Sequence, residues 1–347
     1  MLSSAHRPAW NAFLESKLFF KAPSDVYNVF GLALELRPTS PCEAFVDTLG
    51  LRLIGLFDLL AAAEKNKVTV DKPLYLHGRF FFDPPEVAAV MLDSDSNTGR
   101  HWGYFRDAPD QIPEYIVCAE KSNECKFDIA GSSLFDVLET RLQTRQSTLG
   151  DYEAANLSQK IKDYRTEKLR SQAWSVSALQ DKRSKDIVAA SLHQLGIVVP
   201  VDTTNNTGYR ELPVSGQDLV DLLQQFQSDE SSQNRMARNK LSELMTRVTI
   251  ASDECDFGTG LLLGLDFFTT GSCLEKEALQ LLQVAYTLLD RMNYYNILSG
   301  HCKYRNKCDF YTCIESLVAP SNVKRSRKEN KQETFELPPP LFNNGGK

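Results

Sequence analysis

The sequence contains little that would suit a membrane or secreted protein. Its 347 residues include no run of 18 consecutive apolar residues, so we expect no transmembrane helix. Met1–Trp10 lacks the charged-then-apolar pattern of a secretory signal, which argues against secretion. The eight cysteines are scattered, mostly through apolar runs, and are not spaced like the disulfide framework of a small secreted domain. These absences indicate a protein with reduced thiols that resides in the cytosol or nucleus.

The motifs of a self-sufficient enzyme are also missing. There is no Walker phosphate loop, no G-x-S-x-G nucleophile motif and no H-E-x-x-H zinc motif. Phe257-Gly258-Thr259-Gly260 has two glycines but lacks the third glycine and the strand-then-helix frame of a dinucleotide fingerprint. We interpret this segment as a tight turn. The sequence therefore predicts no cofactor-binding residues.

Positive charge is scarce outside the C-terminal end. The formal net charge is −6, and Lys324–Lys347 carries six basic and three acidic residues, a balance of +3, so the remainder carries −9 (−6 minus +3). An acidic body argues against direct sequence-specific nucleic-acid binding, because nucleic-acid binders present a basic face. It suits a basic protein partner such as a histone tail. The basic run Lys324–Lys328 with Lys331 resembles a nuclear import signal, and a merely solubilising tail is the alternative.

Length and composition predict a folded protein of more than one part. Hydrophobic residues make up 42% and charged residues 24%, which is ordinary for a globular protein, and the length is typical of two domains. We expect an α+β fold with an N-terminal α/β lobe over residues 1–149 that contains an antiparallel meander. A mainly helical lobe follows over residues 150–318. Residues 319–347, rich in Pro, Asn, Lys and Arg, are expected to form a disordered tail.

The expected meander depends on short runs of aromatic and branched residues in the first half. Turn signals separate these runs at a spacing of about ten residues, which is typical of antiparallel strands. Strands are expected at Leu74–Phe82, Val87–Leu92, His101–Arg106, Tyr115–Cys118 and Lys126–Ile129. Helical patterns flank them at Trp10–Phe20, Ser24–Leu36 and Ser132–Gln146.

Helical periodicity dominates the second half. Apolar residues recur there at helical spacing in three stripes, which cover Leu219–Phe226, Leu241–Val248 and Leu274–Met292. Asp151–Trp174 is polar with one apolar stripe, as in a helix that connects two lobes, and Gly196–Val201 is typical of a short strand. We therefore expect the second lobe to be an assembly of helices with one strand.

One cluster near the end of the helical region has metal-ligand residue types. His301, Cys302, Cys308 and Cys313 lie within thirteen residues, and the Cys302–Cys308 spacing is similar to the opening of the poly(ADP-ribose)-binding zinc finger. The glycine and the two downstream histidines of that finger are absent. Because a structural zinc site needs four well-placed ligands, we favour ordinary thiols near a helix terminus and predict no metal.

Asp253, Glu254 and Asp256 form an acidic cluster between an amphipathic helix and the very apolar Phe257–Phe268. Most such clusters are solvated loops or helix caps. Here, however, carboxylates face the negative end of a helix dipole and lie beside an apolar stretch, and both conditions are common at functional sites. From the residues alone, a solvated loop and a reactive site both remain open.

Arg210 lies in a turn between an expected strand and an expected helix. Its segment, Gly208–Pro213, ends shortly before Ser215, which is a plausible helix N-cap. One interpretation of Arg210 is a surface ion pair, which contributes little to stability. The other is a planar donor that holds a carboxylate in place.

Several of these segments resemble the histone PARylation factor family. The matching segments are, in chain order, Asp83–Glu86, Gly103–Asp110, Gly196–Asp202, Gly208–Pro213 and Asp253–Asp266. The resemblance extends roughly over Phe19–Val318, with long stretches of weak similarity. The N-terminus and the tail after about Leu317 depart from the family and inherit nothing from it.

The resemblance implies a protein that is not an enzyme by itself. Members bind the catalytic domain of DNA-damage-activated poly(ADP-ribose) polymerases and complete its active site, while the polymerase binds NAD. By resemblance, Glu254 is the donated catalytic base and Asp253 a contact to the polymerase. Arg210 steadies the glutamate and docks the polymerase C-terminus, with Tyr209 beside that contact. The implied outcome is ADP-ribosylation of serine, notably on histones, in the nucleus at sites of DNA damage, by a chain that is a monomer when free.

The chemistry of the transfer agrees with such a role. A carboxylate acceptor is already ionised at neutral pH, whereas a serine hydroxyl needs a base within hydrogen-bond reach. Two other interpretations remain open: a non-catalytic α/β interaction module that uses Asp253–Asp256 as a recognition loop, and a free-standing hydrolase with paired carboxylates.

Overall fold

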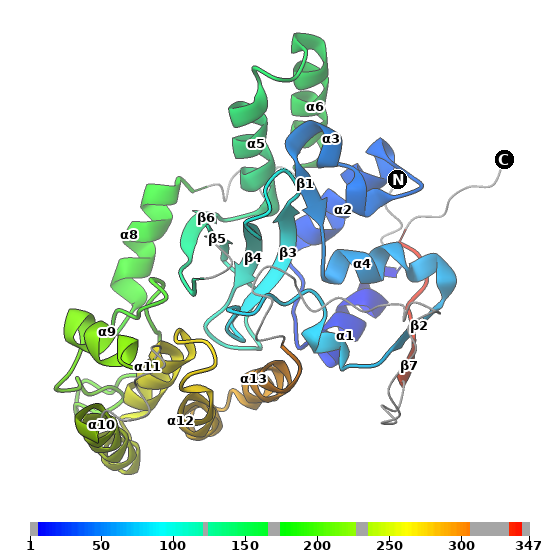
Figure 1. The fold of residues 1–347 in the computed structure, drawn as a ribbon. Coiled ribbons are helices and arrows are strands. Elements are labelled where there is room, and N and C mark those ends of the chain that lie inside the picture. The colour runs from blue at the N-terminus through cyan, green and yellow to red at the C-terminus, as the bar shows by residue number, and fades with distance from the viewer. Residues whose placement is uncertain (1–5, 121–123, 166–173, 227–234, 306–332, 342–347) are drawn as a thin grey trace.

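A five-stranded antiparallel sheet forms the centre of the molecule (Figure 1). The computed structural model describes residues 6–120, 124–165, 174–226, 235–305 and 333–341. The sheet has the order β1-β3-β4-β5-β6, with bounds β1 Leu51–Leu53, β3 Val87–Asp93, β4 His101–Phe105, β5 Tyr115–Ala119 and β6 Asp128–Gly131. From β3 to β6 each strand pairs with the next one along the chain. The predicted antiparallel meander is therefore confirmed.

The predicted strand Leu74–Phe82 is wrong. Its first residues form a 3-10 helix, η4 (Leu74–Leu76), and turns follow. Gly78 has a φ of 74°, which takes the chain out of the extended region, and the Phe80 N–H donates to the Asp83 carboxylate at 3.1 Å. The aromatic residues of this segment are partly or fully buried, so burial rather than strand pairing accounts for their pattern.

The predicted strand Gly196–Val201 is also wrong, because only one isolated bridge forms there, at Ile197. Gly196 has a φ of 65°, and its carbonyl accepts a hydrogen bond from the Arg183 side chain at 3.2 Å. Side-chain partners of this kind satisfy the backbone in place of a ladder. The strand predicted at Lys126–Ile129 exists as β6 but lies two residues further along the chain.

Helices from the first half of the chain pack together on one face of the sheet (Figure 1). They are α1 (Arg7–Leu18), α2 (Ser24–Leu36), α3 (Val46–Leu49), α4 (Leu56–Ala61), α5 (Leu134–Arg145) and α6 (Asp151–Tyr164); two further 3-10 helices are η2 (Pro41–Glu43) and η3 (Ala63–Lys65). The helices predicted in this region are confirmed, with ends that differ by a few residues. α6 packs against α2 and α5 and contributes to their core.

Helices from the second half cover the other face. They are α8 (Val176–Asp186), α9 (Gly216–Gln224), α10 (Arg235–Asp253), α11 (Phe257–Phe268), α12 (Glu275–Leu288) and α13 (Met292–Tyr304). α11 packs against both α10 and α12 and is buried over all but its first residue. The stripe predicted from Leu274 to Met292 is divided between α12 and α13, because Asp290 has a left-handed φ of 56° and ends the first helix. Among the described helices, none is both long and apolar enough to cross a membrane.

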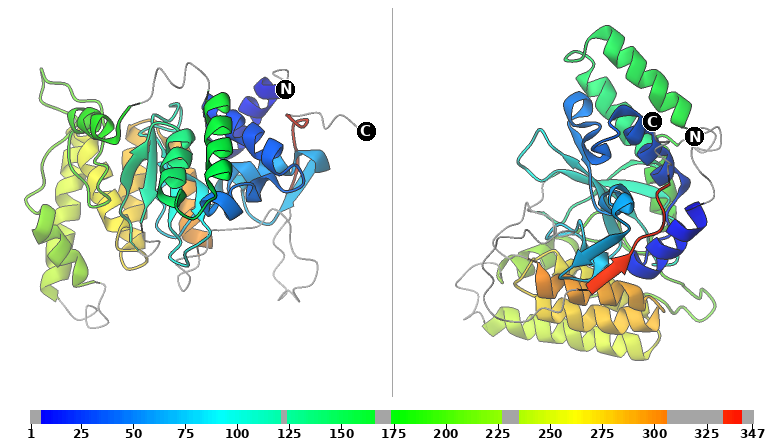
Figure 2. Two further views of the ribbon diagram at one scale, coloured as in Figure 1. Left: turned by 90° about the horizontal axis from the view of Figure 1, so that it is seen from above. Right: turned by 90° about the vertical axis from the view of Figure 1, so that its right-hand side faces the viewer.

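The sheet contributes side chains to two hydrophobic cores. On β4 and β5, Trp102 and Ile116 belong to the core of the N-terminal helices, whereas Phe105 and Val117 belong to the core of α8–α13. Successive side chains of a strand point to opposite faces, so both strands are buried along their whole length. The helices of the two halves of the chain therefore form two layers on one shared sheet (Figure 2).

Residues 333–341 return to the N-terminal layer (Figure 2). β7 (Glu333–Glu336) pairs antiparallel with β2 (Lys67–Val70), and the two leucines that follow β7 enter the first core. These residues differ from the expected disordered tail, because their apolar side chains find a place in the core that composition alone does not reveal. The basic run that includes Lys324–Lys328 lies outside the described residues.

Candidate functional site

The acidic cluster forms the turn that joins α10 to α11. α10 ends at Asp253, where Glu254 donates its backbone N–H to Ile250 at 3.1 Å and so still caps the helix. Cys255 follows with a left-handed φ of 69°, as at many helix C-termini. This reversal leaves Asp253 and Glu254 exposed and turns Asp256 into the protein.

Asp256 anchors the turn to the loop that carries Arg210. Its side chain is 2% exposed. One carboxylate oxygen accepts the backbone N–H of Gly208 at 2.9 Å, and the other lies 2.9 Å from Nη2 of Arg210. A buried carboxylate needs such partners to offset the loss of water. Asp256 therefore fixes two segments that are far apart in the sequence against each other.

The start of α11 completes this attachment. The Thr259 hydroxyl accepts the N–H of Arg210 at 2.9 Å and donates to its carbonyl at 2.8 Å, and Gly258 donates to the Gly208 carbonyl at 2.8 Å. Only glycine fits at both positions. A Cβ on Gly208, whose φ is 120°, would lie 2.3 Å from the Pro200 carbonyl, and one on Gly258 would lie 2.9 Å from that of Gly208. The interpretation of Phe257-Gly258-Thr259-Gly260 as a tight turn is therefore wrong, because this segment is the first turn of α11 and its Gly258 contacts the Arg210 loop.

Arg210 bridges the buried and the exposed carboxylate. Its Nη2 lies 2.5 Å from Glu254 Oε2, and the side chains of Arg210 and Glu254 are 51% and 53% exposed. The hydrogen bond with Glu254 raises the pKa of Arg210, so the guanidinium stays cationic. The result is a surface carboxylate whose position is set by an arginine, which is itself set by the buried Asp256.

The remaining predicted site residues flank this bridge. Asp253 is exposed at the end of α10, and Tyr209 is half-buried beside Arg210. Burial, followed by the charge of Glu211, raises the pKa of Tyr209, so its hydroxyl stays protonated at neutral pH. The sequence showed Asp256 as one of three similar carboxylates, and only its position just before the apolar helix distinguished it as the buried one.

The predicted absence of a metal concerns His301 and its neighbouring cysteines. His301 is fully buried and Cys302 is 8% exposed, while Cys308 and Cys313 lie outside the described residues. Burial lowers the pKa of His301 well below its usual value. Within the described part of the chain, no group of three or more His, Cys, Asp or Glu residues is placed to hold a metal ion.

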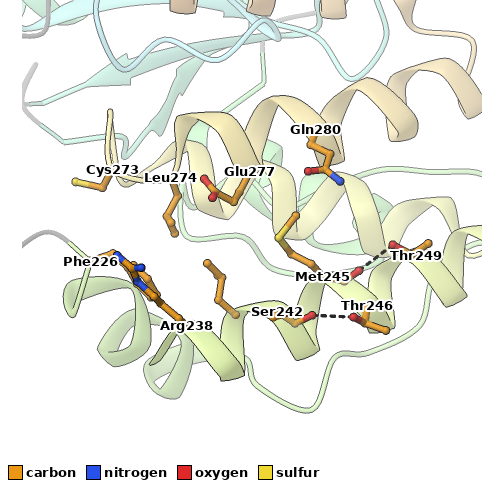
Figure 3. Close-up of a pocket in the computed structure, with 11 residues that line it drawn as sticks. Phe226, Arg238, Ser242, Met245, Thr246, Thr249, Cys273, Leu274, Glu277 and Gln280 are labelled. Carbon is orange, nitrogen blue, oxygen red and sulfur yellow. Dashed lines mark hydrogen bonds between the residues drawn. The ribbon is translucent and has the colours of Figure 1, made fainter. Parts of the chain in front are cut away.

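A groove of about 660 Å³ lies between α10 and α12 (Figure 3). Arg238 and Glu277 line it together with small polar and apolar side chains, and its threonine hydroxyls, such as that of Thr249, donate to carbonyls of their own helix. Thr249 precedes Asp253 by about one helical turn, so this end of the groove lies near the turn that holds Glu254.

Comparison with known proteins places these features in a family. The profile of the family described as histone PARylation factor 1 matches residues 9–305, which is most of the chain. The chain belongs to the histone PARylation factor family. It is 36% identical to histone PARylation factor 1 of Mus musculus over 294 residues, which cover 82% of this chain and 84% of the mouse protein. Identity to the Bos taurus protein is 35% over 302 residues, covering 85% and 87%.

Family membership agrees with the resemblance on which the site residues were predicted. A human relative, described as putative histone PARylation factor 1-like, is 33% identical over 302 residues, covering 85% of this chain and 86% of that protein. All elements of the candidate site, from Gly208 to Thr259, lie inside the matched range. The docked segment 333–341 lies beyond it.

Proposed function

We propose that this chain binds the catalytic domain of a DNA-damage-activated poly(ADP-ribose) polymerase and completes its active site for ADP-ribosylation of serine, notably on histones. Membership of the family supports a link to histone PARylation. The finer proposal is carried by one observation: the Glu254 carboxylate is exposed and is positioned by Arg210, which buried Asp256 anchors. In this proposal the chain is no enzyme alone, because the polymerase holds the NAD.

Glu254 serves as the base that takes the proton of the serine hydroxyl. An acceptor hydroxyl must be deprotonated as it attacks the ribose carbon from which nicotinamide departs, and a positioned carboxylate can accept that proton. A carboxylate on the protein surface can enter a partner's active site, whereas a buried one cannot. The exposure of Glu254 meets this requirement.

Arg210 has two roles in the proposal. It holds one oxygen of the Glu254 carboxylate in an ion pair and so fixes the direction of that side chain. A carboxylate of the partner, such as the polymerase C-terminus, can replace Glu254 on the exposed guanidinium and release it for catalysis. Asp256 keeps Arg210 in place during this exchange, while Asp253 and Tyr209 contact the partner beside it.

The proposal extends to the surroundings in which the protein works. A cofactor that acts on histones belongs in the nucleus, on chromatin at sites of DNA damage. The acidic body of the chain, which carries −9 outside Lys324–Lys347 (−6 minus +3), favours a basic acceptor peptide over DNA. We expect the free chain to be a monomer.

Reconstitution with polymerase, nicked DNA, NAD and a histone peptide tests the proposal. Glu254→Gln preserves shape and removes the base, so serine modification, read by mass spectrometry, should fall about 10²–10⁴-fold. Polymerase binding should remain within about threefold of the unaltered chain, because an exposed ion pair contributes little. Glu243→Gln, an exposed glutamate on α10 paired with Arg247, is the matched control and should retain full activity.

Two outcomes would contradict the base assignment. Retained serine modification in Glu254→Gln would show that the carboxylate is not required. A parallel loss of affinity and serine modification would instead favour a recognition loop at Asp253–Asp256 without a catalytic role. Turnover of a glycosidic substrate by the isolated chain would favour the third interpretation, a free-standing hydrolase.

A further inference from the structure

Residues 333–341 bind along the edge of a strand that has no other strand partner in the described part of the chain. β2 does not belong to the five-stranded sheet and pairs with β7. Val68 faces Phe335 across this ladder, and the N–H of Leu337 donates to the Asn66 carbonyl at 2.9 Å. A main-chain ladder of this kind is how many proteins bind an extended peptide in a manner that tolerates different side chains.

Two leucines after β7 add side-chain selectivity. Leu337 and Leu341 are 7% and 2% exposed and belong to the N-terminal core. Leu341 lines a small cavity of about 80 Å³ together with Phe30 of α2 and Leu60 of α4. The spacing of the two leucines and the shape of this cavity therefore define what can bind next to β2.

Three prolines connect the leucines and cross Trp10 of α1. The indole N–H of Trp10 donates to the Pro339 carbonyl at 2.9 Å, and Trp10 itself is fully buried. Aromatic residues that contact an extended proline-rich segment are a recurrent means of recognising such segments. Because proline restricts φ before binding, the segment loses little conformational freedom when it docks.

The side-chain contacts of β7 itself lie at the surface, where Thr334 hydrogen-bonds Thr69 at 3.1 Å and Glu336 lies 3.8 Å from Lys67. In β7 the side chains of Glu333, Thr334 and Glu336 are exposed and that of Phe335 is half-buried. A two-stranded ladder is marginal in stability without further packing. The groove residues, including Trp10 and Lys67–Val70, lie within residues 9–305 that the family profile matches, whereas the segment lies beyond them. The groove residues thus lie in the part of the chain that the family profile matches, and the segment that fills the groove lies outside that part.

We propose that this surface, the tail groove (β2, Trp10 and the cavity between α2 and α4), is a docking site for a partner protein. The segment that it takes is a short extended strand followed by two leucines separated by three prolines. Residues 333–341 occupy the groove in cis until a partner segment of that pattern displaces them. The tail groove lies on the opposite side of the molecule from α10 (Figure 1), so both surfaces can be occupied together, and this proposal does not depend on the role of Glu254.

Peptide binding to the full chain tests the proposal. The probe is a fluorescein-labelled peptide with the sequence of residues 333–341, and the variant carries Leu337→Asp with Leu341→Asp, which removes the cis competitor from the groove. In the unaltered chain the peptide can bind only those molecules whose own tail has left the groove, and its apparent affinity is reduced in proportion to that fraction. The peptide should therefore bind the variant at least about tenfold more tightly than the unaltered chain. Glu333→Ala changes an exposed residue of the same segment and should behave like the unaltered chain.

A second substitution assigns the binding to the groove itself. In the chain with the weakened tail, Trp10→Phe removes the indole donor and keeps an aromatic ring, so peptide affinity should fall about three- to tenfold. A peptide that carries both aspartates should not bind. Absence of saturable binding to the folded variant, measured by fluorescence anisotropy, would overturn the proposal.

Hydrogen exchange on the unaltered chain tests the same proposal without a variant, in case the variant fails to fold. The amides of β2 and of Leu337 should exchange well before those of β4 and β5, because the tail opens without global unfolding. Exchange of β2 only together with the central sheet would overturn the proposal. A concentration-dependent dimer of the unaltered chain that excludes the peptide would assign the groove to a second copy, and would likewise overturn a role in binding another protein.

Discussion

Two arginines in this molecule hold carboxylates in opposite ways. Arg183 is 6% exposed, and its two terminal nitrogens bind both oxygens of Asp107 at 2.5 and 2.8 Å while its Nε donates to the Leu195 carbonyl at 2.8 Å. Arg210 is 51% exposed, and a single nitrogen serves Glu254 and Asp256. One guanidinium is enclosed and fully coordinated, and the other lies half in solvent.

The difference indicates which pair can exchange its partner. Loss of Asp107 would leave the Arg183 charge buried and unpaired, at a cost that no solvent molecule offsets. Loss of Glu254 leaves Arg210 with Asp256 and with water, so another carboxylate can take the vacated position at little cost. The buried bidentate pair of Arg183 and Asp107 therefore stabilises the fold. The exposed pair of Arg210 and Glu254, which the buried Asp256 holds in place, is suited to a functional site.

The largest expected effect on stability is at the enclosed pair. Arg183→Met leaves Asp107 without its cation and removes the donors to the Leu195 and Gly196 carbonyls, so the free energy of unfolding should fall by about 3–5 kcal/mol. Chemical denaturation measures this change. Glu254→Gln is the matched comparison and should alter the unfolding midpoint little; equal losses in the two variants would remove the distinction between the pairs.

A buried carboxylate that accepts a backbone N–H extends the comparison to pH. Asp266 on α11 accepts the Leu192 N–H at 2.8 Å, and burial raises its pKa to about 7. The folded state therefore holds a proton that the unfolded state releases near pH 4. The stability that this raised pKa gives the fold is fully present at low pH and is lost as the pH rises towards 7 and above. Relative to Asp266→Asn, the unaltered chain should lose on the order of 3 kcal/mol of unfolding free energy between pH 4 and 8. Parallel stability curves would show that Asp266 is not protonated in the fold.

Substitution of Asp256, the buried carboxylate that holds Arg210, should lower serine modification more than it lowers the free energy of unfolding. Asp256→Asn keeps an acceptor for the Gly208 N–H but weakens the hold on Arg210, so serine modification in the reconstituted reaction should fall about tenfold, the equivalent of about 1.4 kcal/mol. Glu211→Gln, which is exposed on the same loop, is the control. An unchanged rate for Asp256→Asn would mean that Arg210 positions Glu254 without its buried partner.

The smallest expected effect is at an exposed pair without an anchor. Arg247 and Glu243 lie 2.8 Å apart at i and i+4 on α10, with side chains 52% and 62% exposed. Glu243→Gln should change the free energy of unfolding by less than about 0.5 kcal/mol. A larger loss, measured by the same denaturation experiment, would show that exposure is a poor guide to the importance of an ion pair in this protein.

The sequence predicted those parts of the fold that depend on local pattern. The strands from Val87 to Ala119 follow from short runs of aromatic and branched residues, and α1, α2, α5, α6, α9, α10 and α12 follow from helical periodicity. The helices α3, α4, α8 and α11 were not predicted from the sequence. The strand predicted at Leu74–Phe82 is wrong because buried aromatic residues in turns have the same composition as a strand. Residues 333–341 were interpreted from a polar and proline-rich composition, and no local pattern shows that their few apolar residues dock on the distant Trp10.

The candidate site could be predicted only in part. The resemblance to a family gave Glu254, Arg210, Asp253 and Tyr209, and periodicity placed the acidic residues at a helix terminus. The contact between Arg210 and Glu254 joins segments far apart in the sequence, so no spacing rule could predict it. The burial of Asp256 depends on the close approach of two glycine-containing segments, which only the folded chain shows.

The central claim concerns one proton, and a comparison of two acceptors tests it most directly. In the reconstituted reaction, a histone peptide with its acceptor serine is compared with the same peptide carrying aspartate at that position. A serine hydroxyl needs the base and an ionised aspartate does not. The ratio of the serine rate to the aspartate rate should therefore fall about 100-fold or more from the unaltered chain to Glu254→Gln. An unchanged ratio, with both rates lowered together, would contradict the account.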